Sequence, residues 1–198
     1  MAQTSTTLSG QKTFKSAITV TEGCTFTSSG GTNKIAAAST SLADLSIRDL
    51  VTVTGTTNNN STFTVKSVDS NGAFITVEET VTAETSDGST DTVLTYTGYV
   101  TDKAKGDGYY SQTDGVHTVA YHVDSSFNTD ATIKMQGSLA TTPTEDDYFD
   151  IDGTTIDSGN FDGSTSVFSV NFTGNFVWVR AKISSHTAGS VTKILYNN

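Results

Sequence analysis

Acidic side chains are the densest group of residues able to do chemistry, and they gather between residues 145 and 152. Three of them, Asp147, Asp150 and Asp152, precede Gly153. Carboxylate oxygens followed by a glycine turn are what a calcium loop needs. The spacing departs from D-x-D-x-D-G and lacks the distal glutamate, and a strand over YFDI would splay the carboxylates. We therefore expect solvated loop acids and no cofactor, with a calcium site at these three residues as the alternative.

The other candidates for catalysis form no recognisable constellation. Two of the acids could hydrolyse a glycosidic bond only in a cleft and with one pKa raised by burial, and the sequence indicates no cleft. His117 and His122 share a predicted strand but are five residues apart, which places them on opposite faces. No G-x-S-x-G elbow, P-loop or G-x-G-x-x-G motif occurs. The chain is therefore predicted not to be an enzyme, and a polysaccharide hydrolase or lyase is kept only as a third alternative.

Tyrosines offer a candidate binding surface. Tyr109 and Tyr110 are adjacent, and Tyr121 lies in the predicted strand that follows. Aromatic faces stack well on other flat or apolar surfaces while the hydroxyl stays in water. We expect these three residues to form an interface or a glycan contact. Tyrosines beside a linker also pack at the seam between domains, so that alternative stays open.

The charge and the single cysteine exclude several classes of partner. The 198 residues carry 21 acids against 11 lysines and arginines, which gives a net charge of −10. An acidic surface repels phosphate backbones, and Arg48 and Arg180 are the only arginines, so no nucleic-acid partner is expected. Cys24 stands alone, which excludes an internal disulfide and a thiolate zinc site. No apolar run of 18 residues and no secretory h-region occurs, so we expect synthesis in a cytoplasm and no membrane partner.

Alternating β patterns must position these residues, because no window shows a convincing helical repeat. The 38 threonines favour the pleated surface of a sheet. We predict an all-β fold of two small antiparallel domains, preceded by a polar arm at residues 1–12 that docks on a neighbour or on the body. Residues 13–100 are predicted to form a β-barrel-like meander. Its strands LVTVTG, TFTVKSV and FITVEE are joined by TTNNNS and DSNG, which have the composition of tight turns.

The second predicted domain is a β-sandwich of jelly-roll type at residues 109–198. Residues 101–108, with glycine and alanine among charges, are predicted to be the linker. The segment FVWVRAKI is the most apolar stretch, and Trp178 at its centre is expected to seed the core. Both faces of this strand carry apolar residues, so it is predicted to be central in the sandwich or to lie at an oligomer contact.

A pattern over residues 33–84 resembles a small β module of virion structural proteins of tailed bacteriophages, especially those of marine and cyanobacterial hosts. The pattern runs from Asn33-Lys34-Ile35 through RDLVTVTGTTNNNSTFTVKSV to FITVEETVTAE. Arg48 and Ser61 stand at two positions where glycine is frequent in that module. The segments ATIKMQGSL, FVWVRAKI and GSVTKILYN are similar to the terminal β-sandwich of such proteins. Together the two resemblances cover about two-thirds of the chain and imply a non-enzymatic particle component.

The expected function is that of a structural protein on the exterior of a tailed-phage virion, most of all a capsid decoration or cement protein. A tail, neck or fibre-base protein is the alternative, as is a carbohydrate-binding host-adhesion module on the virion. The expected partners are other virion proteins, further copies of the chain in a symmetric homo-oligomer, and a host surface glycan if adhesion is its role. Synthesis is expected in the host cytoplasm.

Overall fold

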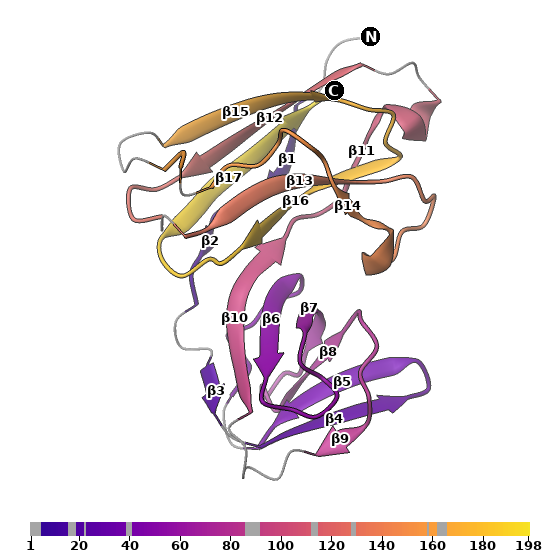
Figure 1. Cartoon of the computed structure of the whole chain (residues 1–198), viewed down its shortest axis with the longest axis vertical. Helices are drawn as coiled ribbons and strands as arrows, with labels where there is room; N and C mark the ends of the chain where they lie inside the picture. The colour runs from indigo at the N-terminus through magenta and orange to yellow at the C-terminus, as the bar shows by residue number, and fades with distance from the viewer. Residues whose placement is uncertain are drawn as a thin grey trace. The chain divides into compact units, whose positions relative to one another are not determined.

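The computed structural model describes residues 5–15, 19–21, 23–38, 41–85, 92–111, 115–127, 130–157, 159–161 and 166–198 (Figure 1). The fold is all-β, as predicted, and its described helices are two short 3₁₀ turns. The chain divides into two compact units. Unit 2 contains residues 15–99, and unit 1 contains residues 1–14 together with residues 100–198.

Unit 2 is built from antiparallel strands. The expected meander is confirmed, because β6 pairs with β7 and β7 pairs with β8. Beyond β8 the order continues to β5, β4 and β9, while β10 pairs with both β6 and β3. The bounds are β3 (Thr19–Thr21), β4 (Cys24–Ser29), β5 (Thr32–Ala37), β6 (Asp49–Thr54), β7 (Thr62–Val68), β8 (Phe74–Val77), β9 (Glu84–Thr85) and β10 (Val93–Val100).

Alternation along these strands builds the core of unit 2. Val51 and Val53 of β6 are completely buried, and Val65 and Ile75 from the next strands are buried with them. Threonines fill the other positions of the ladder, where Thr52 and Thr62 hydrogen-bond across the pair at 2.9 Å. Apolar residues at every second position are therefore enough to explain why this face is inside.

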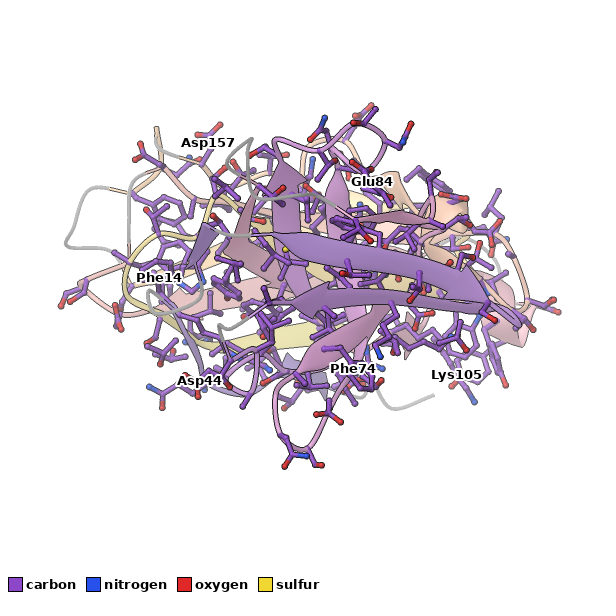
Figure 2. All side chains as sticks on the ribbon, turned by 90° about the horizontal axis from the view of Figure 1, so that it is seen from below. Phe14, Asp44, Phe74, Glu84, Lys105 and Asp157 are labelled. Atoms are coloured by element: carbon purple, nitrogen blue, oxygen red, sulfur yellow. The ribbon has the colours of Figure 1, made fainter. Side chains whose placement is uncertain are left out.

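The two polar turns of the meander are held by carboxylates. In the TTNNNS turn, the carboxylate of Glu84 (labelled in Figure 2) accepts hydrogen bonds from the backbone N–H groups of Thr57 at 2.7 Å and Asn58 at 3.0 Å. These bonds, led by that from Thr57, hold the pKa of Glu84 below its usual value. In the DSNG turn, Gly72 has a φ of 70°, and a Cβ there would come within 2.5 Å of the Ser41 hydroxyl oxygen. Glycine is therefore required at this position.

Unit 1 contains two antiparallel sheets, which lie as two layers in Figure 1. The first sheet has the order β1-β17-β12-β15, with β2 also paired to β17. The second contains β14, β13 and β16, and β11 pairs with β16 as well. The bounds are β1 (Ser5–Ser9), β2 (Lys12–Thr13), β11 (Ala104–Lys105), β12 (Val116–Val123), β13 (Thr132–Ser138), β14 (Phe149–Asp150), β15 (Val167–Thr173), β16 (Trp178–Ser184) and β17 (Ser190–Asn197).

The described part of the N-terminal arm belongs to unit 1. β1 pairs with β17 from Ser5 opposite Asn197 to Ser9 opposite Ile194, and Leu8 is buried. The sequence left open whether the arm docks on a neighbour or on the body of its own chain. The described residues of the arm dock on the body of their own chain. Residues 1–4 of the arm lie outside the described part. The predicted linker at residues 101–108 is also assigned to unit 1, since β11 within it pairs with β16.

Trp178 does not seed the core, contrary to the expectation from FVWVRAKI. Its side chain is half-buried, whereas Val179, Ala181 and Ile183 of the same strand are completely buried. Strand alternation turns Trp178 to the other face of β16. The buried aromatic of this segment is Phe176, and a Cβ on Gly137 would lie 2.5 Å from its ring.

Within the described residues, no helix has the length and apolar character needed to span a membrane.

Candidate functional site

Three aromatic side chains gather on the surface of unit 1, and we call them the aromatic surface. Tyr109 and Tyr110 are 42% and 52% exposed, and their ring centroids lie 5.2 Å apart in an edge-to-face arrangement. The Tyr109 ring meets the Trp178 ring in the same way at 5.0 Å. The Trp178 indole N–H donates to the Thr141 carbonyl at 3.1 Å, which fixes the plane of that ring. The three rings thus form one continuous aromatic cluster.

Two lysines lie on the faces of these rings. The Lys103 ammonium is 4.5 Å from the centroid of the Trp178 ring. The Lys105 ammonium is 4.0 Å from the centroid of Tyr109 and 5.7 Å from that of Tyr110 (Figure 2 labels Lys105). An ammonium over a ring face is attracted by the electron density of the ring. The site therefore combines exposed aromatic faces with two positive charges.

The backbone brings these residues together through two short elements. β11 pairs with β16 so that Lys105 lies opposite Trp178. The 3₁₀ turn η1 (Asp107–Tyr110) follows at once and carries both tyrosines. Gly106 and Gly108 let this turn approach Phe176 closely, since a Cβ on Gly106 would lie 2.5 Å from the Phe176 carbonyl oxygen. The Gly108 N–H donates to that same carbonyl at 2.8 Å.

A buried polar network anchors η1 from below. Asp107, the first residue of the turn, is buried, and its carboxylate accepts from the Gly115 N–H at 2.8 Å. The same oxygen lies 3.6 Å from Nε2 of His117, which is completely buried. His117 Nε2 is 2.9 Å from the Gly174 carbonyl, and Nδ1 is 2.7 Å from the Tyr196 hydroxyl. The network therefore links η1 to β12 and β17.

The hydrogen-bond partners of His117 assign its protons. A carbonyl can only accept, so Nε2 carries a hydrogen and donates it to the Gly174 carbonyl. In the neutral ring Nδ1 then accepts from the Tyr196 hydroxyl. Burial, with a contribution from the charge of Asp107, raises the pKa of Tyr196, so this hydroxyl keeps its proton. The His117 ring also stacks on Phe172 at 5.0 Å. These contacts make His117 a structural group that supports the turn.

The three predicted tyrosines separate in the structure. Tyr109 and Tyr110 lie together on the surface, but Tyr121 is completely buried between the sheets. Its hydroxyl donates to the Thr154 carbonyl at 3.2 Å, and burial raises its pKa. Strand alternation explains this position, because Tyr121 shares the inward face of β12 with His117 and Val119. Tyr121 therefore cannot contact a glycan in this structure.

Two of the three carboxylates of the calcium candidate, Asp147 and Asp150, have separate protein partners. Asp147 accepts from the N–H and hydroxyl of Thr144 at 2.7 and 2.8 Å, and these bonds lower its pKa. Asp150 pairs with Lys134 and accepts from the Gln136 amide at 2.9 Å. Burial raises the pKa of Asp150, but these bonds outweigh burial and leave it below the usual value. No group of three or more potential metal ligands is found among the described residues.

Other charged residues of this region stabilise the sandwich. The Arg180 guanidinium donates to both carboxylate oxygens of Glu145, at 2.8 and 2.7 Å, and its Nε donates to Gln136 at 3.0 Å. Its guanidinium lies 3.6 Å from the centroid of the Tyr148 ring. A bidentate pair with stacking is a strong structural contact. Glu145, at the start of the acidic cluster, is therefore not a solvated loop acid.

The histidines fall on the faces that their spacing predicts. His117 is inside, while His122 lies half-buried on the opposite face of β12. Burial, with the nearby charge of Lys193, lowers the pKa of His122. His186 is buried against the rings of Phe14 and Phe127.

A second surface of interest is the open edge of the first sheet of unit 1. Among the described strands, β12 is the sole partner of β15, and the two pair over seven residues without a register shift. The sequence of β15, VFSVNFT, contains no charged residue and no proline. Its outward side chains, such as Ser169 and Asn171, are exposed.

Sequence reasoning missed Trp178, Lys103 and Lys105 as surface residues. A signal was present, since Lys103 and Lys105 are separated by one alanine and so share a face of any short strand. No sequence pattern indicated the surface position of Trp178, because a tryptophan within an apolar strand is normally predicted to be buried.

Comparisons of the chain with protein-family models, with curated proteins and with solved structures found no match.

Proposed function

We propose that this chain is a non-enzymatic structural component of a tailed-phage virion, most of all a capsid decoration protein, and that it assembles with further copies of itself. The observation that carries the assembly part is the uncharged open edge of β15. The virion part is carried by the resemblance of residues 33–84 and of the three C-terminal segments to virion structural modules.

An open strand edge favours pairing with another chain. Its unpaired N–H and C=O groups are a template for a further strand, and soluble proteins usually protect such edges with lysine, proline, bulges or a covering segment. Charged residues and proline are absent from β15, although the chain as a whole carries a net charge of −10. We infer that a second copy covers this edge, with β15 paired to β15 across a two-fold axis.

The conformation of Arg48 supports the resemblance to the virion module. This residue has a φ of 71°, in the left-handed region that favours glycine. It stands at one of the two positions where glycine is frequent in the resembled pattern. The backbone at this position thus has the left-handed conformation that glycine adopts most readily. Asn33, Lys34 and Ile35 of the same pattern lie in β5, and the rest of the pattern begins just before β6.

The oligomeric state of the purified chain tests the assembly part. We expect a dimer of the 20.8 kDa chain, measured by analytical ultracentrifugation, and a monomer for Ser169→Lys, because the added charge lies at the middle of the edge. Thr25→Lys, an exposed change on β4 of unit 2, is the matched control and should remain dimeric. A wild-type monomer, or a dimer that Ser169→Lys leaves intact, would contradict pairing through β15.

The virion part is tested on particles from a phage that encodes the chain. We expect cryo-electron microscopy to find its density on the capsid exterior, and deletion to remove that density and lower the temperature at which capsids open. Density at the neck, tail or fibre base would instead support the alternative location. A chain missing from purified virions would overturn the virion proposal.

A further inference from the structure

We propose that the aromatic surface and its two lysines bind an acidic glycan, a polysaccharide whose sugars carry carboxylates. This site lies at η1, β11 and the start of β16, and the edge β15 contributes no residue to it. An acidic glycan would therefore be a ligand of this chain in addition to its assembly through β15.

The exposure and geometry of the three rings suit a sugar ligand. Tyr109 contacts both Tyr110 and Trp178 edge to face, while Tyr109 and Tyr110 remain strongly exposed. Large exposed aromatic patches on a soluble protein mark interaction sites. Tyrosine and tryptophan combine an apolar face with a polar group, which matches the apolar C–H face and hydroxyl rim of a pyranose ring.

The two lysines place positive charge on the same rings. The acidic chain has nine lysines, and two of them, Lys103 and Lys105, lie on this one cluster of rings. Among the described residues, neither is in an ion pair with a carboxylate. A local positive site on a protein of net charge −10 is therefore available to an external anion.

The position of the ammonium groups selects acidic over neutral sugars. Each ammonium already lies over a ring face, at 4.5 Å for Lys103 on Trp178 and 4.0 Å for Lys105 on Tyr109. A neutral sugar that stacks there must displace the lysine and offers its charge no replacement partner. A carboxylated sugar draws the ammonium into an ion pair and frees the ring for stacking at the same time.

The support beneath η1 keeps the site ordered before a ligand arrives. Asp107 ties the turn to His117 and Gly115, and the Trp178 N–H is bound to the Thr141 carbonyl. A site whose rings are already placed loses less conformational freedom on binding, which favours affinity.

The test uses the full chain and isothermal titration with oligogalacturonate, compared with the same oligomer after chemical reduction of its carboxylates to alcohols. We expect the acidic oligomer to bind about tenfold or more tightly than the reduced one, and its affinity to fall as salt rises. Lys105→Gln should weaken acidic binding about tenfold, and Tyr110→Ala should weaken it by a similar factor. Lys193→Gln, which removes an exposed lysine from β17, is the control and should bind as the wild type does.

Several results would overturn the proposal. These are failure to bind either oligomer, equal affinity for both, or acidic binding that Lys105→Gln and Tyr110→Ala leave unchanged. Polyglutamate that binds as tightly as oligogalacturonate, without dependence on Tyr110, would also overturn it. That result would indicate that the lysines attract acidic polypeptides by charge alone and that the rings do not recognise a sugar. Ser169→Lys should bind the acidic oligomer with the wild-type affinity per chain. Glycan binding can therefore be judged even if the proposal of assembly through β15 fails.

Discussion

At the scale of single residues, unit 2 contains an ion pair with a completely buried carboxylate. The Asp49 side chain is completely buried, and Lys15 donates to its carboxylate at 2.7 Å. The same ammonium also donates to the Asp44 carbonyl at 2.6 Å and to the Ser46 hydroxyl at 2.9 Å. Burial, with the charge of Asp49, raises the pKa of Tyr96 nearby. One lysine therefore holds both a buried charge and the loop before β6.

Loss of this lysine should leave the Asp49 carboxylate buried without its cation. We expect Lys15→Gln to lower the free energy of unfolding by about 3 kcal/mol, measured by denaturant titration of the full chain. Lys66→Gln is the control, because Lys66 and Glu78 form an exposed pair at 3.1 Å and its removal should cost less than about 1 kcal/mol. Equal losses in the two variants would show that the burial of Asp49 does not matter.

At the scale of elements, the N-terminal strand is a structural part of unit 1. β1 covers β17 through an antiparallel ladder, and Leu8 supplies its main buried apolar side chain. The polar composition of this segment did not predict a strand within the sheet, since serine and threonine are typical of both an arm and an outer strand. Strand positions need only one inward apolar residue in two when the sheet faces water on one side.

Truncation of Leu8 tests whether β1 contributes to stability. We expect Leu8→Ala to lower the free energy of unfolding by about 2–3 kcal/mol, because it removes buried methyl groups and leaves a cavity. Thr6→Ala, on the same strand but exposed, should change it by less than about 0.5 kcal/mol. Circular dichroism during urea unfolding measures both, and a Leu8→Ala loss no larger than that of Thr6→Ala would mean that β1 is dispensable.

At the scale of the whole molecule, net charge opposes self-association. The sequence pI is about 4.5, so near neutral pH the copies repel one another, while the open edge of β15 attracts. The pKa values of Glu84, Asp147 and Asp150 lie below their usual values, so these acids keep their charge as the pH falls through the ordinary carboxylate range. The fall in net negative charge toward the pI must therefore come from protonation of the other carboxylates.

Association should increase as the pH falls toward the pI, because repulsion fades while strand pairing does not depend on charge. We expect light scattering to show larger species between about pH 5 and pH 4.5 than at pH 7. Ser169→Lys should suppress this growth, whereas Thr25→Lys adds the same charge away from the edge and should not. Equal growth in both variants would point to general precipitation near the pI.

The sequence alone determined the class of the fold, because apolar residues at every second position specify strands wherever one face is buried. It also predicted the meander over residues 50–78 and the opposite faces of His117 and His122, which follow from the same period. Only the tertiary structure decided which face of β16 is inside, and so placed Val179, Ala181 and Ile183 in the core and Trp178 on the other face. It decided as well which face of β12 is inside, and so buried Tyr121. It also decided that Tyr109 meets Trp178, because strand pairing between β11 and β16 joins residues more than seventy positions apart. Contacts at that separation depend on how sheets pair, which local composition does not encode.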